Sequence, residues 1–210
     1  MSKRTISLII ALFLVTVLLL GIALSNSPKT LPGKTISNSP APTPYMQTNL
    51  AFSPSMITVP FGAIAPQTVK VMMSTSANQA TGIQLELSYD PKALTNVSVA
   101  TGTMFTNPLM FNNKVDAVNG KISFSYAITP SQQPQKGDGT VAIITFTPVR
   151  SPVDANGVRL TQTMIKFLPK TEVSARGVDQ SVLTNSSFNN MFTVSFGSGA
   201  TSVLPVSTTP

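Results

Sequence analysis

The sequence predicts an all-β fold, an antiparallel β-sandwich, over residues 49–197 of its 210. From Leu50 onward, apolar residues recur at every second position, which is typical of strands buried on one face. Turn signals such as Asp90-Pro91 and Asn119-Gly120 separate these runs at a spacing of roughly ten to fifteen residues, as in a sandwich of short strands. No amphipathic helix of useful length interrupts this pattern.

Nine segments carry the strand pattern. They run, in chain order, over 55–60, 68–76, 82–89, 96–100, 121–128, 140–149, 158–168, 171–175 and 191–197. Segment 82–89 alternates without a break, which predicts that its apolar residues are buried: Ile83, Leu85, Leu87 and Tyr89. Segment 121–128 predicts the same for Ile122, Phe124, Tyr126 and Ile128. Ile143 and Ile144 make segment 140–149 apolar on both faces, which favours a central strand.

The step Asp90-Pro91 interrupts this alternation directly after Tyr89. Proline has no N–H and cannot lie in a central strand ladder. It does suit the first position of a short helical turn, with the preceding Asp as the cap. We therefore expect a corner at which the chain leaves one sheet and Leu94 returns to the core.

The remaining turns are interpreted as structural. Asn119-Gly120 is the pair expected in a two-residue hairpin turn. Gly137–Gly139 and Asp154–Asn156 carry oxygen ligands of the kind that Ca²⁺ takes. Neither has the alternating acids of a dedicated calcium loop, so we favour tight turns in which Asp accepts backbone N–H bonds.

Composition excludes several classes of chemistry. The chain has no His and no Cys, so neither a histidine-activated nucleophile nor a zinc site of His and Cys can form. The seven acidic residues lie mostly at turns, and we expect no enzymatic activity. The basic residues do not cluster, which argues against nucleic-acid binding. With no Trp and three Tyr, an aromatic platform for polysaccharide is not expected, although a weak cleft binder stays open.

The termini predict an exported protein. Lys3-Arg4 precede an uncharged apolar run over residues 6–24, so residues 1–25 are a signal peptide or a transmembrane signal anchor. Retention would anchor the domain outside the membrane, and cleavage after Ser25 would secrete it. Residues 26–48 have the Pro/Ser/Thr-rich composition of a linker, and residues 198–210 that of a disordered tail.

Four stretches in order resemble the bacterial cohesin family, the β-sandwich modules of cellulosome scaffolds, and are also similar to related carbohydrate-binding sandwiches. They are GIQLELSYDPKALTNVSV (82–99), ATGTMF (100–105), FNNKVDAVNGKISFSYA (111–127) and GDGTVAIITFTPV (137–149). The resemblance covers about residues 48–197. It implies a nine-stranded jelly roll with one flat sheet face that recognises a calcium-loaded dockerin.

By alternation, the resemblance places that partner-binding face on the outward residues Gln84, Glu86, Ser88, Asn112, Lys114, Ser123 and Ser125, with Val141 and Ile143 as further members. It implies a non-catalytic extracellular module that docks a dockerin-type protein at the cell surface, with a role in polysaccharide breakdown. No cofactor is expected, and any calcium is expected on the partner. A carbohydrate-binding module and a structural subunit of the cell envelope are the alternatives.

Overall fold

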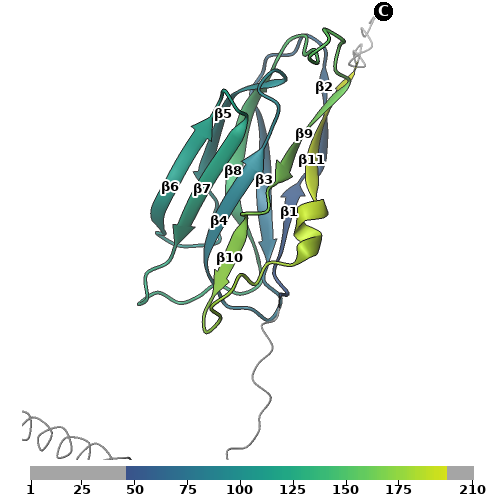
Figure 1. Cartoon of the computed structure of the whole chain (residues 1–210). Helices are drawn as coiled ribbons and strands as arrows, with labels where there is room; N and C mark the ends of the chain where they lie inside the picture. The colour runs from purple at the N-terminus through teal and green to yellow at the C-terminus, as the bar shows by residue number, and fades with distance from the viewer. Residues whose placement is uncertain (1–45, 198–210) are drawn as a thin grey trace, which may run out of the picture. The chain divides into compact units, whose positions relative to one another are not determined.

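The computed structural model describes residues 46–197, so the predicted export segment, most of the predicted linker and the predicted tail lie outside the described residues. Within 46–197 the chain forms eleven strands and one short 3-10 helix, Asn185–Asn189. Figure 1 shows the strands in two facing layers. No helix in this described range is long and apolar enough to cross a membrane.

The first layer is a four-stranded sheet. Its order is β1 (Asn49–Ser53), β3 (Gln67–Ser74), β8 (Asp138–Pro148) and β5 (Leu94–Thr101). All of its pairings are antiparallel. β8 lies between two neighbours, as its apolar residues on both faces predict, and Ile144 is fully buried while Ile143 is half-buried.

The second layer is a seven-stranded sheet. Its order is β2 (Met56–Pro60), β11 (Met191–Gly197), β9 (Gln162–Phe167), β4 (Ala80–Ser88), β7 (Lys121–Ala127) and β6 (Leu109–Asp116). The seventh strand, β10 (Glu172–Ala175), pairs with the first half of β4, while β9 pairs with its last residues. Figure 1 shows β6, β7, β4 and β10 side by side.

The hydrophobic core fills the space between the two layers. The inward residues predicted on segments 82–89 and 121–128 are buried, except Ile128, which is half-buried. The Tyr126 hydroxyl donates a 2.7 Å hydrogen bond to the carbonyl oxygen of Val141 and so ties β7 to β8 across the core. Among the described residues, the buried hydrophobic side chains run from Leu50 to Phe196. Because residues 46–197 contain their whole core, we expect this segment to fold by itself.

The prediction of an all-β sandwich is confirmed, but two of its details are wrong. The described chain has eleven strands rather than about nine, because β1 and β6 also form strands. β2 and β11 pair in parallel, so the sandwich is not wholly antiparallel. The reason is that alternation tells which face of a strand is buried, whereas the direction of its neighbour depends on the path of the chain.

The corner at Asp90-Pro91 is confirmed. The Asp90 carboxylate accepts a 2.9 Å hydrogen bond from the N–H of Lys92, and the Asp90 carbonyl oxygen accepts one of 2.9 Å from the N–H of Leu94. β4 before the corner belongs to the seven-stranded sheet and β5 after it to the four-stranded sheet. Leu94 is 1% exposed, so the chain does return directly to the core.

The two-residue turn expected at Asn119-Gly120 is wrong, although the hairpin exists. β6 and β7 are joined by four residues, 117–120, because Asp116 pairs with Lys121. Asp116 caps this longer loop, since its carboxylate accepts hydrogen bonds from the N–H groups of Val118 (3.1 Å) and Asn119 (3.0 Å). A side-chain cap of this kind favours a wider turn than the residue pair alone predicts.

Candidate functional site

The seven predicted partner-binding residues share one exterior surface of the seven-stranded sheet, which we call the outer face. It is formed by Gln84, Glu86, Ser88, Asn112, Lys114, Ser123 and Ser125. They lie on three neighbouring strands, β4, β7 and β6, with β10 beside β4. Lys114 is exposed and the other six side chains are half-buried. The structure therefore brings all seven together, while their role in binding stays a prediction.

The strand register arranges these residues in rows across the sheet. Gln84 pairs with Ser125, which pairs with Asn112. Glu86 pairs with Ser123, which pairs with Lys114. Cross-strand neighbours of this kind have Cβ atoms about 5 Å apart, so the rows form a continuous polar surface.

A chain of side-chain hydrogen bonds runs through the centre of the outer face. The Asn112 amide donates to the Ser123 hydroxyl at 2.7 Å, and that hydroxyl donates to Glu86 Oε1 at 2.6 Å. The backbone of Glu86 is held as well, because Thr171 exchanges hydrogen bonds with its N–H (3.1 Å) and its carbonyl oxygen (2.9 Å). The carboxylate is thus positioned before any partner arrives, which lowers the entropic cost of recognising a cation or a hydroxyl there.

The two further members expected on this surface do not lie there. Val141 is fully buried in the core, and Ile143 is half-buried on β8 of the other sheet. The central position of β8 explains the error. A strand apolar on both faces gives no alternation from which the outward residues can be chosen.

The loop beside the outer face carries a perturbed acid, Asp116. The Asn119 side chain donates a 2.8 Å hydrogen bond to Asp116 Oδ2. This bond, then the backbone N–H groups of Asn119 and Val118 and the charge of Lys114, lower the pKa of Asp116 below its ordinary value of 3.8. Because the folded pKa is depressed, the contribution of Asp116 to stability is complete above the ordinary value and is lost as the pH falls through the folded pKa.

We therefore expect Asn119→Ala to raise the pKa of Asp116 back toward its ordinary value, since the first of these hydrogen bonds disappears. The measurement is a pH titration of the Asp116 carboxyl carbon by NMR. Val118→Ala is the matched control, because it keeps the backbone N–H that bonds Asp116. An unchanged pKa in Asn119→Ala would show that the amide is not what stabilises the charge.

Sequence reasoning missed Phe111, which is 69% exposed at the margin of the outer face. The register of β6 against β7 shifts between Met110 and Asn112, so Phe111 is the extra residue of a β-bulge. Its neighbours Leu109 and Met110 are also exposed, at 50% and 44%. The available signal in the sequence was a run of three consecutive apolar residues, Leu109 to Phe111, which strict alternation of a half-buried strand does not produce.

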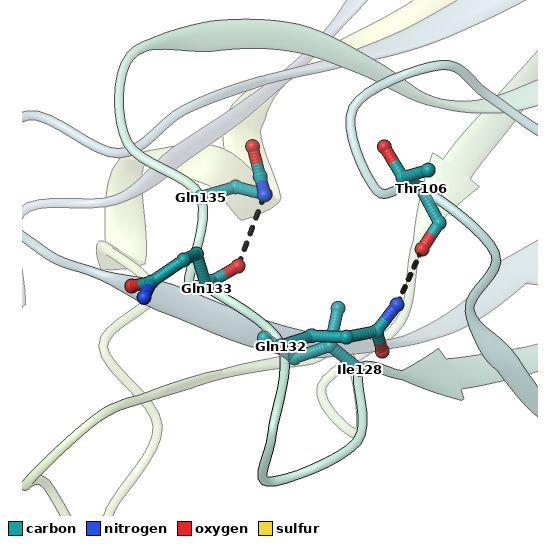
Figure 2. A pocket seen from close by; sticks show the side chains of 5 residues that line it. All are labelled: Thr106, Ile128, Gln132, Gln133 and Gln135. Atoms are coloured by element: carbon teal, nitrogen blue, oxygen red, sulfur yellow. Dashed lines mark hydrogen bonds between the residues drawn. The ribbon is translucent and has the colours of Figure 1, made fainter.

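A hollow of about 220 Å³ lies among loop residues, away from these strands' paired centre, and is shown in Figure 2. Its glutamines serve mainly to hold the loop. Gln132 donates to the carbonyl oxygen of Thr106 at 2.8 Å and accepts a 2.7 Å bond from the N–H of Thr129. Gln135 donates to the carbonyl oxygen of Gln133 at 3.0 Å. We assign this hollow a structural role.

The turn at Asp154–Asn156 has the tight geometry that we favoured. Asp154 Oδ1 accepts hydrogen bonds from the N–H groups of Asn156 (2.8 Å) and Val158 (2.9 Å). Asp138 is the first residue of β8 and follows Gly137, whose φ is +99°. Within residues 46–197, no three acidic side chains gather in a way that could hold a metal ion.

Comparison with known proteins matches this part of the chain to a family model. The family model described as Cohesin domain matches residues 67–188, a range that includes the three strands of the outer face, β4, β7 and β6, and more than half of the chain. No curated protein matches the chain.

Solved structures of cohesins share the fold. A scaffoldin B cohesin of Acetivibrio cellulolyticus, solved in complex with a Cel5 dockerin, is similar with a TM-score of 0.57 and 18% identity over 71% of this chain and 99% of that one. A cohesin from a Clostridium thermocellum complex with Doc918 has a TM-score of 0.55 and 14% identity over 71% and 99%. A non-cellulosomal cohesin of the archaeon Archaeoglobus fulgidus has a TM-score of 0.52 and 16% identity over 71% of this chain and 91% of that one. At these identities the likeness shows a common fold.

Proposed function

Because the chain belongs to the cohesin domain family, we propose that it is a non-catalytic binding module whose outer face docks a dockerin-type protein. The observation that carries the proposal is the position of the family match, which includes every strand that builds the outer face. Two of the similar cohesins are solved together with dockerins, which supports a partner of this class.

The outer face has the character of a moderate protein interface. It offers amide, hydroxyl and carboxylate groups at its centre, the exposed Lys114 beside them, and the exposed apolar side chains of Leu109, Met110 and Phe111 at one end. Tyr89 and Tyr126 are both buried, so neither supplies an aromatic platform for a sugar ring. These features favour a protein over a polysaccharide as the ligand.

The setting of the module is part of the proposal. The apolar run over residues 6–24 supports export, with the domain outside the membrane and held by the anchor, or released where the segment is cleaved. In that position the module would gather dockerin-bearing proteins at the cell surface, with a role in polysaccharide breakdown where those partners are hydrolases.

The proposal is tested by isothermal titration calorimetry of residues 46–197 against the dockerin-type modules encoded in the same genome. We expect at least one to bind in calcium and to lose binding in EDTA, because a dockerin needs its own calcium to fold. Glu86→Ala should weaken that binding about tenfold with an unchanged melting temperature, as expected for truncation of a central interface side chain.

Thr68→Ala is the matched control for Glu86→Ala, because Thr68 is exposed on β3 of the other sheet. The absence of binding to every dockerin at concentrations up to about 100 µM would contradict the proposed function. Strong binding to a glycan array in place of a dockerin would favour the carbohydrate-binding alternative.

A further inference from the structure

A hollow of about 290 Å³ lies at the apolar end of the outer face. Phe111 on β6 and Glu172 on β10 line it from opposite strands, and Gly82, Ser125 and Ala127 line it between them. A Cβ atom on Gly82 would lie 2.7 Å from that of Ala127, so the two middle strands run close together with small residues on the floor.

The β-bulge in β6 accounts for the position of Phe111. β6 is the last strand of its sheet, and its Asn113 donates a 3.2 Å hydrogen bond to the carbonyl oxygen of Val99 on β5. That bond fixes the strand against the other sheet, while the bulge directs the extra residue onto the hollow. The bulge and the nearby Lys114 also disfavour pairing of another strand with the edge of β6. A partner is therefore expected to contact the side chains at this edge rather than add a strand to it.

Glu172 gives the hollow its charge. It is exposed, pairs with Gln84 in the strand register, and is the one charged side chain among the described residues that line the hollow. The Gln84 amide donates a 3.2 Å hydrogen bond to the carbonyl oxygen of Lys170, so one of its two N–H donors is already used. The hollow is therefore aromatic on one side and anionic on the other.

The width of the hollow suits one long side chain. β6, β7, β4 and β10 are successive neighbours, so the Cα atoms of Phe111 and Glu172 are about 14 Å apart at ordinary strand spacing. The two side chains reach inward from both sides and leave a gap that an extended lysine or arginine can span. An anionic group would be repelled by Glu172, and a purely apolar group would desolvate its carboxylate without a partner.

We propose that this hollow binds a lysine or arginine side chain of the docked protein, with its stem against Phe111 and its cation at Glu172. Such a side chain packs its methylene groups on the ring and places its charge beside the carboxylate. The assignment rests on the proposed function for the identity of the partner, and it names the residue type that the outer face selects.

The first experiment needs no partner. Residues 46–197, labelled with ¹⁵N, are titrated with N-acetyl-lysine methylamide, and the norleucine compound serves as the matched control without the cation. We expect lysine to shift the amide signals of Phe111, Ser125 and Glu172 at concentrations near 50 mM, as weak single-group contacts require, and Glu172→Gln to remove the shifts. Equal shifts with norleucine, or none in the hollow, would overturn the assignment.

The second experiment uses a dockerin captured as described above. We expect Glu172→Gln and Phe111→Ala each to weaken capture about five- to tenfold, with a smaller salt dependence in Glu172→Gln. If both variants bind the captured dockerin with unchanged affinity, the assignment of the hollow as a site for a cationic side chain is overturned, while the proposed function stays intact. Lysine-specific shifts without capture of any dockerin would instead reject the dockerin partner and support a cation-presenting protein of another class.

Discussion

Ser123→Arg is expected to abolish capture of the dockerin partner, with a loss of at least about a hundredfold in affinity. Ser123 lies at the centre of the outer face, where it accepts a hydrogen bond from Asn112 and donates one to Glu86. A long guanidinium side chain there would stand above the sheet and hold an approaching protein away. It would also occupy the Glu86 carboxylate that a partner would otherwise reach.

The measurement is calorimetry of capture together with the melting temperature of each variant. We expect the melting temperature of Ser123→Arg to stay within about 3 °C, because two partly exposed hydrogen bonds are worth about 1 kcal/mol in a domain of this size. Thr68→Arg introduces the same side chain at an exposed site on β3 and should bind normally. Unaltered capture by both Ser123→Arg and Glu86→Ala would remove the outer face as the docking surface.

Gly120→Ala is expected to lower the free energy of unfolding by about 3 kcal/mol or more, the largest stability effect among the glycine turns. Gly120 has a φ of +61°, where an L side chain is strained. An added Cβ would also meet the carbonyl oxygen of Tyr89 and lie 2.8 Å from Pro91 Cδ. The Gly120 carbonyl oxygen accepts a 2.8 Å bond from the N–H of Tyr89, so the β6–β7 loop cannot move away without breaking it.

Gly157→Ala separates the two causes of this loss of stability, which are backbone strain at positive φ and steric contact with Tyr89 and Pro91. Gly157 has a similar φ of +78° but nothing within 4 Å of an added Cβ, so its substitution should cost only about 1 kcal/mol of backbone strain. Urea unfolding of both variants gives the comparison. Equal losses would mean that the contact between the hairpin loop and the Asp90-Pro91 corner does not constrain the fold.

The sequence was sufficient to predict the parts of the fold in which one face of a strand is buried and the other is not. Segment 82–89 alternates cleanly, and this pattern placed both the core residues and the outward Gln84, Glu86 and Ser88. The Asp90-Pro91 corner was also predictable, because a capped turn is a local structure set by adjacent residues. The resemblance, applied with this alternation, brought the seven residues of the candidate site onto one face.

The sequence was insufficient where the structure depends on neighbours that are distant in the chain. Val141 was misplaced because β8 is apolar on both faces. The parallel pairing of β2 with β11 joins segments far apart in sequence, and alternation carries no information on it. Phe111 was missed because a bulge interrupts the alternation that predicts which way a side chain points.

The central claim is that the outer face is the surface that docks a dockerin. Its most direct test is an NMR footprint of the complex between the two proteins. Residues 46–197, labelled with ¹⁵N, are mixed with the calcium-loaded dockerin that calorimetry identifies. We expect signals from β4, β7, β6 and β10 to shift or broaden, including Gln84, Ser123 and Ser125, while the outward residues Thr68 and Lys70 of β3 stay unchanged. A footprint confined to the four-stranded sheet, or to loops away from the outer face, would contradict the account.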